Sequence, residues 1–224
     1  MPVTELALIP SATPGFITPE LLAVGQNGLL LQSEWAAKHA TSTFPPGPPA
    51  VRGAAIYQQR EDDGIILLTA HWDSPAQHAE CIASEENQEA MAAIVPHILP
   101  SEIKISHVAG VYMLDQETLD MGLLSVVKIG VRDDMGENGR ARIEKLWGRM
   151  GGLLAARAGL EHKAGWRIET DLELEGREEF IVVGAWRDEE VLKELTEGGL
   201  GQAWDMGWRD DVLDMDIKTY RRIA

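Results

Sequence analysis

The chain has 224 residues, of which 45% are apolar and 25% are charged, and its formal net charge is −16. Because this charge repels phosphate backbones and anionic lipids, we expect neither nucleic acid nor a membrane surface as a partner. No apolar run approaches the roughly 20 residues of a membrane-spanning helix, and the length suits one large domain or two small ones.

The single cysteine, Cys81, cannot form an internal disulfide, which fits a reducing compartment. The first residues, MPVTELALIP, contain neither a basic region nor a long apolar core, so we expect no signal peptide. A cytoplasmic location is therefore expected. No Cys/His spacing resembles a zinc site, and we expect no metal.

The first half of the chain predicts the element order β-α-β-β-α-β. Thr18-Pro19 is a typical helix start, Asp63-Gly64 a hairpin turn, and Ser74 to Gln77 a capping box. The predicted strands cover residues 3–9, 54–60, 65–72 and 103–113. The predicted helices cover residues 19–39, 75–83 and 84–95.

After a polar linker at 115–122, the second half predicts the same order. Its strands are expected at 124–131, 166–174, 179–186 and 212–221, with a hairpin turn at 175–177. Its helices are expected at 138–158 and after Asp188, where Gly198-Gly199 interrupts the second one.

The two halves also repeat a sequence pattern. Residues 65–74 read IILLTAHWDS and residues 180–188 read FIVVGAWRD, so Trp72 and Trp186 lie 186 − 72 = 114 residues apart. Such duplication predicts two similar units, here ferredoxin-like modules at 1–114 and 123–224. A four-stranded antiparallel sheet with helices on one face leaves its other face open. We therefore expect an α+β barrel formed within one chain, a monomer that is an internal pseudo-dimer, with further association left open.

The segment at 67–91, LLTAHWDSPAQHAECIASEENQEAM, combines an apolar strand, a Trp, an acid and a serine-capped helix. It resembles the antibiotic-biosynthesis-monooxygenase (ABM) family of the dimeric α+β barrel superfamily, well in the first module and loosely in the second. The chain is thus similar to fungal tandem ABM proteins of small-molecule biosynthesis. The resemblance implies a small hydrophobic, aromatic or polyketide-like substrate and monooxygenase, cyclase, isomerase or decarboxylase chemistry without a cofactor.

Haem-degrading relatives use a proximal His in the helix after the Trp and an Asn on the first strand. In this chain the resemblance places that helix position near Met91, and the strand at 3–9 has no Asn. Haem is therefore not expected, and no other cofactor is predicted.

Three histidines are candidate bases, because imidazole can take a phenol or enol proton near neutral pH. His107, in an otherwise apolar strand, ranks first, ahead of His78 in the helix after Ser74 and His71 beside Trp72. His71 and Trp72 leave opposite faces of their strand. The alternative for each histidine is a structural role, in which His107 pairs with Tyr57 or a buried water.

Trp72, Tyr57 and Trp35 are the expected walls of a substrate pocket, and Glu5 is expected to orient a polar substrate. The alternatives are a packing role for Trp72, which Trp186 repeats, and a solvated charge for Glu5.

The leading hypothesis is a tailoring enzyme that deprotonates a hydrophobic molecule with a histidine of the first module. In it, the second module acts mainly as a built-in partner. The rival hypothesis is a noncatalytic ligand-binding or structural barrel, which predicts satisfied histidines and no useful pocket.

Overall fold

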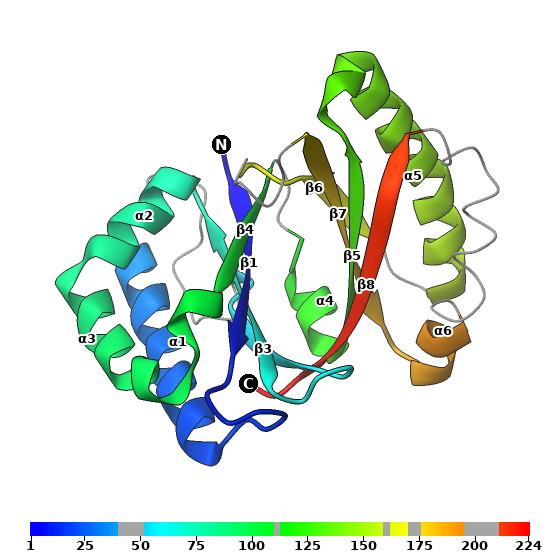
Figure 1. Ribbon diagram of the computed structural model, residues 1–224. Coiled ribbons are helices and arrows are strands. Elements are labelled where there is room, and N and C mark those ends of the chain that lie inside the picture. The colour runs from blue at the N-terminus through cyan, green and yellow to red at the C-terminus, as the bar shows by residue number, and fades with distance from the viewer. Residues whose placement is uncertain (40–51, 110–112, 159–161, 170–175, 195–210) are drawn as a thin grey trace.

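The computed structural model describes residues 1–39, 52–109, 113–158, 162–169, 176–194 and 211–224 (Figure 1). The strands of these residues form one antiparallel sheet in the order β4-β1-β3-β2-β8-β5-β7-β6. They are β1 (Val3–Pro10), β2 (Ala55–Gln59), β3 (Ile65–Trp72), β4 (Lys104–Ala109), β5 (Leu123–Arg132), β6 (Lys163–Trp166), β7 (Arg177–Trp186) and β8 (Val212–Arg222).

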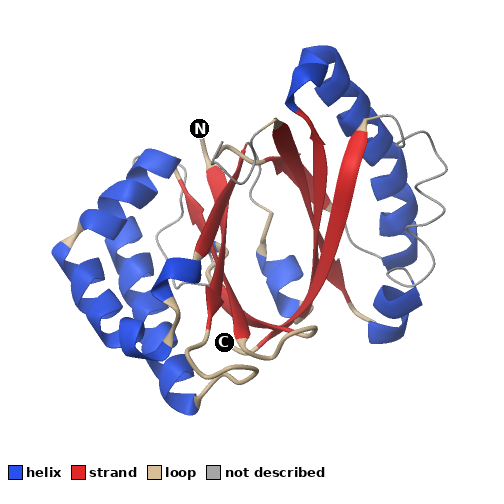
Figure 2. Ribbon diagram, in the orientation of Figure 1, coloured by secondary structure: helices blue, strands red, loops and turns tan. Residues whose placement is uncertain are grey.

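Most helices lie on the outside of this sheet, whereas α4 (Gln116–Asp120) lies between the two half-sheets (Figure 2). The others are α1 (Pro19–His39), α2 (Pro75–Ala83), α3 (Glu85–Ile94), α5 (Gly136–Ala158) and α6 (Glu189–Glu194), with short 3-10 turns at Val95–His97, Pro100–Glu102 and Asp133–Met135. Figure 1 shows α1, α2 and α3 beside the first half and α5 and α6 beside the second. No helix of the described residues is long and apolar enough to span a bilayer.

The helix starts follow from local capping. Ser74 accepts a hydrogen bond from the Gln77 amide at the start of α2, and Ser84 accepts one from Asn87 at the start of α3. These side chains satisfy amides that have no partner inside the helix. The break between α2 and α3 therefore falls where the second capping serine stands, as predicted.

The sheet closes into a barrel through two seams between the halves. At one seam β2 pairs with β8, and the Arg60 amide donates to the Thr219 carbonyl at 2.9 Å. At the other, β4 meets β6 through a Val108–Arg167 bridge, and the Ile168 amide donates to the His107 carbonyl at 2.9 Å. The predicted barrel of two fused ferredoxin-like modules is therefore confirmed.

The core of the barrel draws on both halves. One cluster of buried side chains includes, from the first half, Leu6, Tyr57, Leu67 and Val108 and, from the second, Leu124, Val126, Ile181 and Tyr220. Each open sheet face is covered by the other, so neither half has its own complete interior core.

The segment between the modules differs from the prediction. The linker at 115–122 contains α4, which begins at Asp115, whose side chain accepts from the Thr118 amide. Leu119 on α4 is fully buried in the core of the barrel. The sequence did not predict this helix, because its five residues are polar for the most part and too few to show a hydrophobic period.

The second hairpin also differs from its prediction. The strand expected at 166–174 is β6 at Lys163–Trp166, which pairs with Phe180 to Val183 of β7. The residues at 170–175 and the glycines 198–199 lie outside the described residues. Strand pairing, rather than the apolar alternation of one segment, determines where β6 begins.

Candidate functional site

Buried polar side chains form a chain of contacts that reaches the β4–β6 seam. Trp72 Nε1 donates to Glu5 Oε2 at 2.6 Å, and the same oxygen lies 3.6 Å from His78 Nε2. His78 Nδ1 lies 2.8 Å from His107 Nε2, and His107 Nδ1 lies 2.5 Å from Glu169 Oε1. We call Glu5, Trp72, His78, His107 and Glu169 the relay network.

Strand register and helix capping bring the first-half members together. Glu5 on β1 lies opposite His107 on β4, and both side chains face the helices. Because Ser74 fixes the start of α2, His78 lies over the sheet and stacks on Trp72 with ring centroids 4.6 Å apart. The sequence nominated these four residues one by one, and the structure places them in contact.

Glu169 comes from the second half and was missed by sequence reasoning. Besides its contact with the His107 ring, it accepts from the His107 backbone amide at 2.9 Å, and Arg167 Nε donates to it at 3.4 Å. Its side chain is 28% exposed, compared with 3% for Glu5. The network therefore runs from the protein interior toward solvent.

Burial shifts the proton equilibria of this network. It raises the pKa of Glu5 to about 7, although the Trp72 hydrogen bond and the charge of His107 oppose the shift. Burial, together with the charge of His107, lowers the pKa of His78 to about 3. For Glu169, burial raises the pKa, but hydrogen bonds from the His107 ring and amide outweigh it and hold the pKa below its ordinary value. Near neutral pH, Glu5 exchanges a proton, His78 is neutral and Glu169 is a carboxylate.

Trp35 belongs to the same side of the sheet. It packs with Val3, Ala70, Trp72 and Cys81, and its ring centroid lies 6.4 Å from that of Trp72. Gln32 on α1, which sequence reasoning did not select, donates to Glu5 at 3.4 Å. The environment of Glu5 is therefore apolar except for a few hydrogen-bonding partners.

Tyr57 and His71 lie on the opposite face of the sheet. Tyr57 is fully buried in the core of the barrel, where its hydroxyl has no hydrogen-bond partner among the described residues. His71 Nε2 accepts from the Leu114 amide at 3.3 Å. The sheet separates both residues from the relay network. The expectations that Tyr57 pairs with His107 and shares a pocket with Trp72 are therefore wrong.

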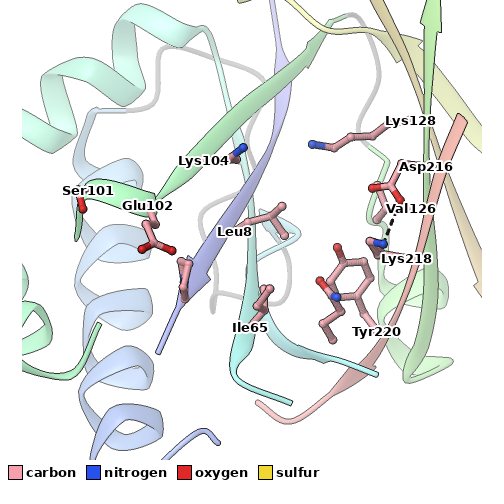
Figure 3. Close-up of a pocket in the computed structure, with 12 residues that line it drawn as sticks. Leu8, Ile65, Ser101, Glu102, Lys104, Val126, Lys128, Asp216, Lys218 and Tyr220 are labelled. Carbon is pink, nitrogen blue, oxygen red and sulfur yellow. Dashed lines mark ion pairs between the residues drawn. The ribbon is translucent and has the colours of Figure 1, made fainter. Parts of the chain in front are cut away.

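The described residues form a small cavity beside the network. A cavity of about 10 Å³ lies next to it and is lined by Gln32, Ser33, Ala36, Arg52, Ala54, Ala70, His71 and Trp72. A cleft of about 470 Å³ lies elsewhere, between the two half-sheets (Figure 3). Of these two spaces, only the smaller is lined by Trp72.

The second half repeats the position of Trp72 but has other residues in place of Glu5 and His107. Trp186 Nε1 donates to Ser125 Oγ at 2.8 Å. Ser125 on β5 lies opposite Thr219 on β8, just as Glu5 lies opposite His107. A serine and a threonine stand where the first half has a carboxyl and an imidazole, and the ring of His162 lies edge-on to Trp186 with ring centroids 4.9 Å apart.

The seams repeat each other as well. Glu61 accepts from the Thr219 amide at 3.0 Å and from the Thr219 hydroxyl at 2.8 Å, as Glu169 accepts from His107. At both seams, a carboxylate thus accepts a hydrogen bond from a backbone amide of the adjoining strand. At the β4–β6 seam that carboxylate, Glu169, also binds the imidazole of His107.

The described side chains near the network do not form a binding site for a metal ion or haem. Among the described residues, no group of three or more His, Cys, Asp and Glu is arranged to hold a metal ion. His78, in the helix after Trp72, directs one ring nitrogen to His107 and the other toward Glu5. This geometry does not fit an axial haem ligand.

Comparison with known proteins supports the fold. No protein-family model and no curated protein matches the chain. Among solved structures, an anthrone oxidase-like protein matches with a TM-score of 0.57 at 12% identity, covering 100% of this chain and 92% of the other. A haem-binding protein of Thermus thermophilus matches with 0.54 at 11%, covering 100% and 92%. A proposed monooxygenase of Lactobacillus acidophilus NCFM matches with 0.52 at 12%, covering 99% and 93%.

These similarities define the class of the fold. The chain is an α+β barrel of the dimeric type, with both ferredoxin-like modules in one polypeptide. Identities of 11 and 12% show the fold alone. The three names also differ in chemistry, and a shared fold does not choose between them.

Proposed function

We propose that the protein is a small-molecule tailoring enzyme that removes a proton from a hydrophobic aromatic or polyketide-like substrate. The relay network carries this proposal, because it combines a buried carboxyl whose pKa is about 7 with two histidines and a second carboxylate. Strongly shifted, mutually connected ionisable groups are concentrated at functional sites. The trio of apolar neighbours Trp35, Trp72 and Cys81 would suit an aromatic ring.

In this proposal Glu5, and not His107, is the base that touches the substrate. Both ring nitrogens of His107 are engaged, by His78 and Glu169, so the first-ranked histidine has no lone pair for a substrate. A carboxyl with a pKa near the working pH is an efficient general base. His78 and His107 then act as relay groups behind it.

The relay moves one proton from Glu5 to His107, and the total number of protons on the network stays the same. After the substrate proton reaches Glu5, each histidine carries one proton, on Nδ1. Glu5 then passes its proton to His78 Nε2 while His78 passes its own to His107 Nε2. Glu5 is again a carboxylate, and the cationic His107 lies beside the Glu169 carboxylate. The 3.6 Å between Glu5 and His78 must shorten to hydrogen-bond length for the first transfer.

The deprotonated substrate would react with molecular oxygen in the leading version of the proposal. One oxygen atom enters the product, as when an activated CH₂ becomes C=O, and the other leaves as water. Cyclisation, isomerisation or loss of carbon dioxide would begin from the same anion. The names of two similar structures, an anthrone oxidase-like protein and a proposed monooxygenase, favour the oxygen route.

A noncatalytic barrel is the second candidate. It is favoured by the 10 Å³ cavity beside the network and by the internal pairing of both histidines. In that case the relay network would only stabilise the seam, and its replacement would change stability without any effect on a reaction.

Oxygen consumption with a panel of anthrones and other phenolic polycycles tests the proposal. We expect Glu5→Gln to lower kcat by a factor of about 10² or more, the usual contribution of a general base. We also expect the wild-type kcat/KM to rise as the pH passes about 7, where Glu5 ionises.

The matched control is Ser125→Ala, which alters the equivalent position of the second half and should leave kcat unchanged. His107→Gln and Glu169→Gln should lower kcat and change the pH profile, because they interrupt the relay behind the base. Near-normal turnover by Glu5→Gln would reject the assignment, and failure of the wild type on the whole panel would favour the noncatalytic barrel.

A further inference from the structure

The cleft of about 470 Å³ lies on the opposite side of the sheet from the relay network. It opens between the two half-sheets, bordered by β1, β3 and β4 on one side and β5 and β8 on the other (Figure 3). Its volume falls within the range of about 300–1,000 Å³ that is usual for small-molecule sites. The proposed deprotonation does not use it.

Apolar side chains form much of its wall. Leu8 and Ile65 come from the first half, and Val126 and Tyr220 come from the second. Such walls are suited to the body of an aromatic or aliphatic ligand, because burying apolar surface contributes roughly 25 cal/mol per Å². The wall alone would not select a ligand, so the polar groups of the cleft determine its specificity.

Three lysines and two carboxylates, Glu102 and Asp216, line the cleft, so its lining carries an excess of positive charge in a protein whose net charge is −16. Lys128 on β5 and Lys104 on β4 extend toward each other from opposite walls in Figure 3. Lys218 pairs with Asp216 at 3.0 Å. For Lys128, the described residues provide no ion pair or hydrogen bond, although the strand directs its side chain inward next to Val126.

The position of Lys128 is unfavourable for an ammonium group without an anion. Burial lowers its pKa; Glu179 and Asp216 oppose the shift, while Arg167 and Lys104 add to it. An anion bound between the two lysines would offset this desolvation and repulsion, since charge-assisted contacts are strongest where water is excluded.

We propose that this cleft binds a small organic carboxylate, whose anionic group lies between Lys128 and Lys104 and whose apolar body packs on Leu8, Val126, Ile65 and Tyr220. This site is separate from the proposed active site, because the sheet lies between the two. It would hold either an effector or a second reactant, and it does not depend on Glu5 being a base.

Isothermal titration calorimetry at pH 7 and low salt, with 2-naphthoate and its neutral analogue 2-naphthamide, tests this inference. We expect the wild type to bind the carboxylate at least tenfold more tightly than the amide. Lys128→Met should weaken the carboxylate at least tenfold and leave the amide within twofold, and Lys128→Arg should retain most of the affinity. Lys145→Met, which removes an exposed lysine of α5 and makes the same change of charge, should bind as the wild type does.

A second measurement uses the wild type alone and so remains valid if a variant does not fold. Reductive methylation followed by peptide mass spectrometry should show that 2-naphthoate shields Lys128 and leaves Lys145 reactive. Equal binding of the two probes, unchanged affinity in Lys128→Met, or methylation of Lys128 at the same rate with and without 2-naphthoate would overturn the proposal. Glu5→Gln should bind 2-naphthoate normally, which separates this test from that of the proposed enzyme.

Discussion

Glu5 has almost no contact with water, since only 2% of the residue is exposed. Burial raises its pKa from 4.5 to about 7, whereas in an unfolded chain it titrates near its ordinary value. Between about pH 4.5 and pH 7 the folded protein therefore binds more protons at this residue than the unfolded chain does. The contribution of Glu5 to stability is present at low pH and is lost as the pH rises through this window.

We expect Glu5→Gln to raise the free energy of unfolding above pH 7 by up to about 3.5 kcal/mol, because it removes a carboxyl whose pKa is raised from 4.5 to about 7, at about 1.4 kcal/mol per pKa unit. The glutamine oxygen can still accept from Trp72, and near pH 4.5 the variant should match the wild type. Urea denaturation from pH 4.5 to 8 measures the difference, with the exposed Glu34→Gln as control. A difference that does not vary with pH would contradict the assignment.

For single residues, the sequence was enough to select ionisable candidates, but it did not show which residues contact them. Glu5, His78 and His107 could be nominated from their types and positions. Glu169 could not, because its contact with His107 joins residues 62 apart across a seam between modules. Tyr57 was misplaced for a related reason: it pairs with Leu67, which lies an odd number of residues from Trp72 and so faces the other way.

At the scale of elements, α4 closes part of the barrel interior with a single short helix. Leu119 on this helix is fully buried among side chains from both half-sheets. Asp115 fixes the start of the helix through the Thr118 amide at 2.9 Å. The connection between the modules is thus a structural part of the core.

Leu119→Ala should lower the free energy of unfolding by about 3 kcal/mol, since it removes a large apolar side chain from a packed site and leaves a cavity. The measurement is the urea midpoint at pH 7. Glu117→Ala, which changes an exposed residue of the same helix, should shift it little. A loss below about 1 kcal/mol for Leu119→Ala would mean that α4 only covers the core and does not fill it.

Most elements could be predicted because their signals are local. Capping serines and the Asp-Gly turn determine where α2, α3 and β3 begin, and these starts agree with the structure. The position of β6 depends instead on its pairing with β7, and α4 is too short to show a period. Local chemistry therefore predicts boundaries, whereas pairing partners have to be found in three dimensions.

At the scale of the whole molecule, each half completes the other. The halves meet at the β2–β8 and β4–β6 seams and share one interior cluster. The internal repeat predicted this arrangement, because two open sheet faces in one chain cover each other. It did not predict the cleft, whose volume depends on how the facing side chains fill the space between the sheets.

We expect the two halves to unfold as one unit. Hydrogen exchange measured by mass spectrometry in increasing urea should give the same opening free energy for the slowest amides of β1 and β5, because exposing either strand exposes the shared core. The control is α6, which lies outside that cluster and should exchange through smaller openings. Different limiting values for β1 and β5 would show that the modules are independent.

The two seams have similar contacts but different residues at equivalent positions. In a symmetric assembly of identical subunits, every amino-acid change occurs at both contacts. In this fused chain Thr219 and His107 can differ although they lie at matching points. The unfavourable burial of an imidazole is thus confined to the β4–β6 seam. At the β2–β8 seam the carboxylate of Glu61 only binds the neutral hydroxyl and the amide of Thr219.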